Sequence, residues 1–139
     1  MSPLPRAVAS AAGASQPSPY LCDYTDVHSD DMPAAMESCI RRTGKRVQLS
    51  GNELALHFDN GKACTFVSNT TACSKGSVAD CRYFIFLGFV RPANAFVVAG
   101  HCYEFCADAY LINASDGCEI ALASPPHISP DGRVFIGIV

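Results

Sequence analysis

The chain has 139 residues, of which 49% are hydrophobic and 17% are charged, and its formal net charge is −3. This length predicts one domain that can bury a core, and the acidic balance argues against nucleic acid as a partner. No apolar run reaches the roughly 18 residues that a transmembrane helix needs, so we expect no membrane span.

Residues 1–19 are rich in alanine, serine and proline, and they contain no apolar core of a signal peptide. We expect a flexible lead-in here, left after a signal peptide has been removed. The alternative is a cytosolic chain that is native from Met1. Residues 20–139 are predicted to form a single all-β domain with one helix.

That helix is predicted over about residues 31–42. Ser29, Asp30 and Asp31 offer side-chain oxygens that cap a helix N-terminus, and Gly44 suits the position after the last turn. Apolar residues at helical spacing form one stripe, which consists of Met32, Met36, Cys39 and Ile40. A stripe of this kind is typical of a helix that packs on a core.

After the helix, apolar stretches alternate with turn signals, among them Ser50-Gly51-Asn52, Asn60-Gly61, Asp116-Gly117 and Asp131-Gly132. Strands are predicted over residues 45–49, 53–58, 62–68, 81–91, 95–104, 109–113, 118–123 and 133–139. Their short connections favour a mainly β antiparallel meander, and a sandwich, an open barrel and a propeller-like sheet are all compatible with it. The stretch 81–91 is almost wholly apolar, which predicts a central strand buried on both faces.

Two connections are too long for tight turns, residues 69–80 and residues 124–131. Long loops on a rigid sheet often carry function. The first is polar and has cysteines at or near both ends, so we expect it to be a tethered binding loop. Its tip, the predicted partner-binding site, consists of Ser74, Lys75, Gly76 and Ser77.

Eight cysteines are distributed along the chain without the spacing of a zinc site. We expect all of them to form disulfides in the periplasm or outside the cell, where oxidising conditions stabilise such bonds. They are Cys22, Cys39, Cys64, Cys73, Cys81, Cys102, Cys106 and Cys118. Among the many complete pairings, the strand pattern favours Cys22–Cys39, Cys64–Cys73, Cys81–Cys118 and Cys102–Cys106.

Residues 96–102 (FVVAGHC) resemble the histidine segment of trypsin-like serine proteases, in which the histidine is the general base. The resemblance stops there, because no Gly-Asp-Ser-Gly segment follows His101. Ser115, in the turn Ser115-Asp116-Gly117, is better explained as a hairpin residue.

Two further constellations of cysteine and histidine invite a chemical interpretation. His101, Cys102 and Cys106 include two types of zinc ligand, but a zinc site needs four ligands, usually in two close pairs. Cys102 as a nucleophile with His57 or His127 as its base is compatible with the sequence. Neither pattern is specific, so we predict no metal, no cofactor and no catalytic residue.

The segment 128–135 (ISPDGRVF) resembles the strand-turn element of propeller-type repeats. A similar Asp-Gly-Arg element occurs in periplasmic immunity proteins that neutralise type VI secretion amidase effectors. That resemblance implies an exported protein-binding domain, an inhibitor or immunity protein whose partner is a secreted effector, cell-wall hydrolase or toxin.

Two alternatives belong to other classes of protein. One is a small hydrolase with an unrecognised Cys/His site. The other is a structural surface module, because the apolar stretch 136–139 invites pairing with another chain. The latter predicts a homodimer through the C-terminal strand.

Overall fold

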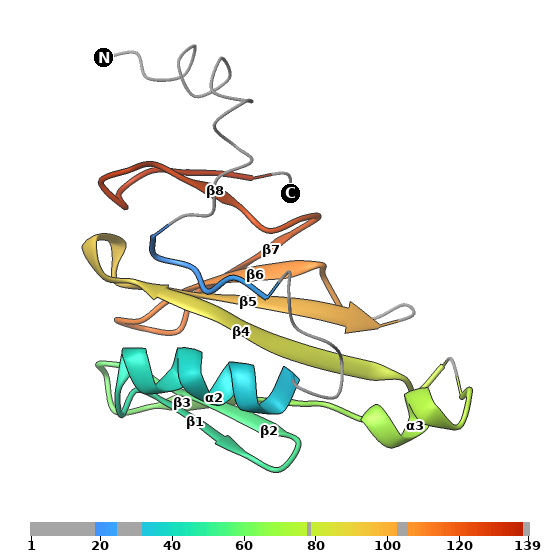
Figure 1. Cartoon of the computed structure of the whole chain (residues 1–139). Helices are drawn as coiled ribbons and strands as arrows, with labels where there is room; N and C mark the ends of the chain where they lie inside the picture. The colour runs from blue at the N-terminus through green and yellow to red at the C-terminus, as the bar shows by residue number, and fades with distance from the viewer. Residues whose placement is uncertain (1–18, 25–31, 78, 103–105, 138–139) are drawn as a thin grey trace.

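The computed structural model describes residues 19–24, 32–77, 79–102 and 106–137. The described chain is mainly β, as expected, with three antiparallel sheets, one main helix and three disulfides. Two of the sheets form layers that face each other, and they do not close into a barrel (Figure 1). No helix within the described ranges is long and apolar enough to cross a membrane.

The predicted helix is confirmed as α2, Met32–Thr43. Its stripe faces inward, because Met36 and Cys39 are buried and the other two members pack against the core. Gly44 ends the helix with a φ of +94°, and its N–H donates to the Ile40 carbonyl at 3.1 Å. The predicted capping residues 29–31 lie outside the described residues.

The first sheet has three strands in the order β1-β2-β3. They are β1 (Val47–Ser50), β2 (Glu53–His57) and β3 (Ala63–Val67). The predicted turns join them, with Gly51 at a φ of +61° and Gly61 at +86°. The alternation of β2 is confirmed, since Leu54 and Leu56 are buried between two exposed ends.

The second sheet has four strands in the order β4-β5-β6-β7. These are β4 (Arg82–Val90), β5 (Ala95–Cys102), β6 (Ala109–Asn113) and β7 (Glu119–Leu122), and the short helix η3 (Arg91–Ala93) links the first two. The prediction that residues 81–91 form the central strand is wrong, because β4 lies at the edge. Its neighbour β5 is the strand buried on both faces, with four consecutive buried residues at its start. Residues 19–24 and α2 cover β4, which explains its apolar sequence.

Both predicted long loops contain regular structure. Within residues 69–80 lies the short helix α3 (Thr70–Ser74). Within residues 124–131 lies β8 (His127–Ile128), which pairs with β9 (Phe135–Ile136) to form a third sheet. The strand predicted over 133–139 is therefore shorter than expected within the described residues. Asp131-Gly132 makes the turn as predicted, with Gly132 at a φ of +74°.

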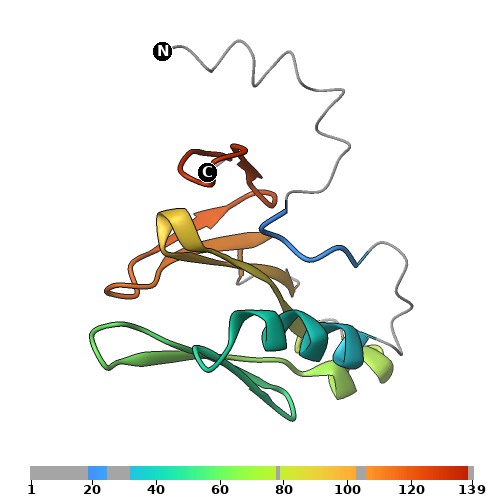
Figure 2. The same ribbon diagram turned by 60° about the vertical axis from the view of Figure 1, so that its left-hand side comes forward.

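The core lies between the two large sheets, and α2 packs against both β4 and β1 (Figure 2). Phe86 and Phe96 of the second sheet are fully buried and contact each other, with ring centroids 6.4 Å apart. Phe66 of β3 reaches across to Phe84 and Tyr110 at 5.1 and 5.4 Å. Burying a large aromatic or aliphatic side chain contributes roughly 1.5–3 kcal/mol, so this interior is what fixes the two sheets together.

The disulfides confirm half of the predicted pairing. The structure contains the bridges Cys22–Cys39, Cys73–Cys81 and Cys102–Cys106. The predicted Cys64–Cys73 and Cys81–Cys118 bridges are wrong, and Cys64 and Cys118 are free. The reason is that Asn69 bridges to Arg82, which brings α3 beside the start of β4. Cys73 then meets Cys81, whereas Cys64 packs against the core.

Candidate functional site

The two ends of the α3 loop, defined as residues 69–77 and 79–81, are held side by side where β3 passes into β4. The Asn69 N–H donates to the Arg82 carbonyl at 2.7 Å, and Arg82 Nε donates to the Val67 carbonyl at 3.2 Å. The Phe84 N–H donates to Ser68 Oγ at 3.0 Å. This junction connects the two large sheets, so the loop is anchored where the sheets meet.

Within the α3 loop, backbone hydrogen bonds and a disulfide leave little freedom. Asn69 caps the helix, because its Oδ1 accepts from the Ala72 N–H at 3.2 Å. The Ser77 N–H donates to the Ala72 carbonyl at 2.9 Å, and the Cys81 N–H donates to the Ser77 carbonyl at 3.0 Å. The Cys73–Cys81 bridge closes the same segment covalently. The loop is therefore pre-organised rather than a flexible connection.

The predicted partner-binding residues are all exposed at the tip of this loop. Ser74 ends α3, and the Lys75 N–H bonds back to the Thr71 carbonyl at 3.1 Å. Gly76 takes a φ of +74° with open space around it, and this backbone conformation turns the chain back toward β4. Figure 1 shows α3 at one end of the molecule, where another protein can reach it.

The tip offers hydrogen-bonding groups and one positive charge. Ser77 Oγ lies 3.4 Å from Asp80 Oδ2, and Ser74 Oγ lies 3.4 Å from the Thr70 carbonyl. Lys75 forms no ion pair within the described residues. Such a surface can hydrogen-bond to a protein and attract a carboxylate.

The residues weighed for catalysis are not brought together. His101 is exposed and stacks on Tyr83, with ring centroids 4.8 Å apart. Ser115 Oγ accepts from Asn94 Nδ2 at 3.1 Å and has no histidine partner among the described residues. The nucleophile hypothesis for Cys102 is wrong, because that sulfur is bonded to Cys106.

Among the residues that the structure describes, the other histidines and the free cysteines do not form a site either. His57 is exposed and lies 3.3 Å from Gln48 Oε1. Burial raises the pKa of the Cys64 thiol, and the nearby Glu119 carboxylate raises it further. Cys118 is exposed. Across the described part of the chain, no three histidine, cysteine, aspartate or glutamate side chains are grouped to hold a metal ion.

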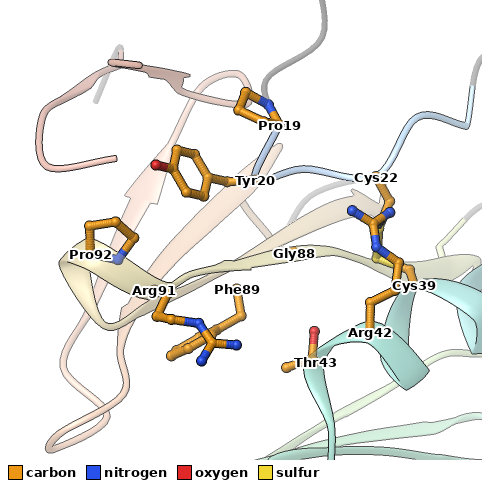
Figure 3. Close-up of a pocket in the computed structure, with 10 residues that line it drawn as sticks. All are labelled: Pro19, Tyr20, Cys22, Cys39, Arg42, Thr43, Gly88, Phe89, Arg91 and Pro92. Carbon is orange, nitrogen blue, oxygen red and sulfur yellow. Dashed lines mark hydrogen bonds between the residues drawn. A yellow bond between two sulfur atoms is a disulfide. The ribbon is translucent and has the colours of Figure 1, made fainter. Parts of the chain in front are cut away.

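Sequence reasoning missed one concave site, a pocket of about 280 Å³ beside α2 (Figure 3). Arg42 from the end of α2 and Arg91 from the start of η3 line it, together with Tyr20 and Phe89. These residues come from separate parts of the chain. No motif or spacing in the sequence marks them as neighbours.

The comparisons with known proteins found no significant match to a family model, to a curated protein or to a solved structure.

Proposed function

We propose that this protein is an exported protein-binding domain, an inhibitor or immunity protein that blocks a secreted cell-wall hydrolase or toxin in the periplasm or outside the cell. The observation that carries the proposal is the α3 loop, which is exposed at one end of the molecule and closed by the Cys73–Cys81 disulfide. The resemblance of residues 128–135 to immunity proteins of type VI secretion amidase effectors points to the same class of partner.

A rigid loop favours tight binding because little conformational entropy is lost when it docks. Ordering a mobile side chain at an interface costs about 0.5–1.5 kcal/mol, and ordering the backbone costs more. In the α3 loop the Asn69 cap and the Cys73–Cys81 bridge already restrict the chain in the folded protein, so less conformational entropy is left to lose on binding. This is the property that an inhibitor needs at its contact surface.

Disulfides support the proposed location. Six of the eight cysteines are paired in three bridges. Structural disulfides persist mainly in oxidising compartments and are rare in the cytosol.

The test compares the native chain with a tip variant in which Ser74, Lys75 and Ser77 are all alanine. Each protein is immobilised and exposed to the secreted proteins of the source organism, and retained hydrolases are identified and assayed on cell-wall substrate. We expect the native chain to retain and inhibit one such hydrolase. The tip variant should bind at least tenfold more weakly, which corresponds to the loss of one or two interface contacts.

A matched control replaces Lys62, an exposed lysine in the turn between β2 and β3, with alanine. The control should bind as the native chain does. If the tip variant also binds fully, the loop assignment is wrong. If no secreted hydrolase is inhibited, the inhibitor function is wrong.

A second candidate, a structural surface module, rests on exposed strand edges. In β7, the edge strand of the second sheet, Ile120 is 51% exposed. In β9, which pairs only with β8, Ile136 is 38% exposed. Apolar edges of this kind favour pairing with another chain. Sedimentation of a monomer at about 100 μM would contradict both this candidate and the predicted C-terminal homodimer.

A further inference from the structure

The pocket beside α2 is built by a close backbone contact and a disulfide. Gly88 lets residues 20 and 21 approach β4, since an added Cβ would lie 2.3 Å from the Tyr20 carbonyl oxygen. The Cys22 N–H donates to the Leu87 carbonyl at 2.7 Å, and Cys22 is bonded to Cys39 of α2. The walls of the pocket are therefore fixed relative to one another.

Two arginines give this pocket a positive charge in a chain whose net charge is −3. Figure 3 shows Arg42 rising from α2 on one side and Arg91 extending from the start of η3 on the other. Arg42 Nη1 lies 3.4 Å from Cys22 Sγ, which is a weak acceptor. Neither guanidinium is ion-paired to a carboxylate in the described part of the chain. Among the described residues, therefore, no carboxylate occupies their donors.

The rest of the lining provides an apolar surface next to that charge. Figure 3 shows Arg91 and Phe89 beside each other, with Tyr20, Pro19 and Pro92 above them. The Phe89 ring is held in place by Phe96, at 5.1 Å between centroids, and by the Arg46 guanidinium, 5.0 Å from the ring centroid. Arg46 itself is neutralised by Asp59 at 2.9 Å. Phe89 and Arg91 both line the pocket, so a ligand here meets an aromatic ring and a guanidinium.

We propose that this pocket binds the C-terminal carboxylate of a peptide chain whose last side chain is apolar or aromatic. A guanidinium forms two parallel hydrogen bonds with a carboxylate. In a C-terminal residue the carboxylate and the side chain share one Cα, which suits a pocket that is lined both by Arg91 and by Phe89, two positions earlier in the chain. A bare phosphate would use the guanidiniums but would leave the aromatic wall without a contact. A volume of about 280 Å³ suits one residue rather than a larger cofactor.

The inference goes beyond the proposed function, because it concerns another part of the surface and does not depend on the identity of the partner. Its test is a titration of the full, disulfide-bonded chain, labelled with ¹⁵N, followed by amide chemical shifts. The probes are the peptide N-acetyl-Ala-Ala-Ala-Phe with a free carboxylate, the same peptide with a C-terminal amide, and inorganic phosphate. We expect the acid to shift the amides of Thr43, Gly88 and Phe89 with a Kd on the order of 1 mM.

The variant that tests the charge replaces both Arg42 and Arg91 with glutamine. Both side chains are exposed, so the fold should persist, and the same spectra report on it. Its Kd for the acid should rise at least tenfold, since hydrogen bonds to charged groups are lost. Arg41→Gln, on the same helix and outside the pocket, is the matched control and should bind as the native chain does.

Three results would overturn the proposal. One is that the peptide with a free carboxylate produces no saturable change in amide chemical shifts below about 10 mM. Another is that the amidated peptide or inorganic phosphate binds as tightly as the peptide with a free carboxylate. The third is a double variant that retains native affinity. If the double variant does not fold, the single variant Arg91→Gln decides, with at least a threefold rise in Kd as the expected result.

Discussion

Replacing Gly88 with alanine adds one methyl group where residues 19–24 lie closest to β4. The new Cβ would lie 2.3 Å from the Tyr20 carbonyl oxygen and 3.2 Å from Leu21 Cα. Both neighbours are backbone atoms, so a side-chain rotation cannot relieve the contact. Gly88 also has a φ of +157° and follows the register shift after Phe86. L side chains rarely adopt this conformation.

The expected loss of stability has two parts. Overpacking at a well-packed position typically costs about 1–3 kcal/mol, and an unfavourable backbone conformation costs on the order of 1–3 kcal/mol. Together they predict that Gly88→Ala lowers the free energy of unfolding by about 4 kcal/mol. At roughly 3–5 °C per kcal/mol for a domain of this size, the melting temperature should fall by about 15 °C.

The assay is urea unfolding followed by circular dichroism under non-reducing conditions, with Gly61→Ala as the matched control. Gly61 has a φ of +86° but nothing within 4 Å of an added Cβ, so only backbone strain applies. That control should lose about 1–2 kcal/mol. If Gly88→Ala is no more destabilising than Gly61→Ala, the close approach of Tyr20 to β4 does not contribute as described.

Three further predictions follow from the disulfides, the free thiols and a half-buried tyrosine. Replacing Cys73 and Cys81 with serine opens a bridge across a sequence separation of 8 and should cost about 2–3 kcal/mol in urea unfolding. A loss below about 0.5 kcal/mol would show that the α3 loop is ordered without the bridge. A thiol reagent should modify the exposed Cys118 before Cys64, because burial raises the pKa of the Cys64 thiol, and Cys118→Ser should abolish the fast phase. An unchanged fast phase would contradict the assignment. Burial raises the pKa of Tyr24 from 10.0 to about 12, while the nearby Arg42 charge opposes the shift. The unfolded chain therefore releases this proton first, so stability should fall as the pH rises from 10 to about 12. Tyr24→Phe should remove the part of this stability loss that comes from Tyr24. It should also remove the phenolate absorbance that appears last as the pH is raised. If the stability of the variant falls with pH as steeply as that of the native chain, Tyr24 is not the group responsible.

Local patterns in the sequence predicted the elements well because they depend on neighbouring residues. The stripe of α2 and the glycine that ends it are confirmed, and so are the hairpin turns at Gly51, Gly61 and Gly132. These features rest on helical spacing and on the freedom of glycine at positive φ, both of which are readable without the fold. The same holds for Cys22–Cys39 and Cys102–Cys106, each of which joins elements close in the sequence.

The predictions that failed required knowledge of which elements meet in space. β4 was expected to be central because its sequence is apolar, yet segments outside its sheet bury it. The strand pattern favours Cys64–Cys73 because these cysteines bracket the start of a loop, but the Asn69–Arg82 bridge places Cys81 beside Cys73 instead. Periodicity reports that a side chain is buried and does not report what covers it.

Of the two candidate sites, one could be predicted from the sequence and the other could not. The exposed tip of the α3 loop could be predicted from composition alone, since a polar stretch between cysteines favours a tethered loop. The pocket could not, because Tyr20, Arg42 and Arg91 are far apart in the chain and meet only when residues 19–24 pack on β4 beside α2. The sequence by itself determined a mainly β, disulfide-bonded domain. The packing of its sheets decided which cysteines pair and where positive charge meets an aromatic surface, because those contacts join residues that local spacing does not relate.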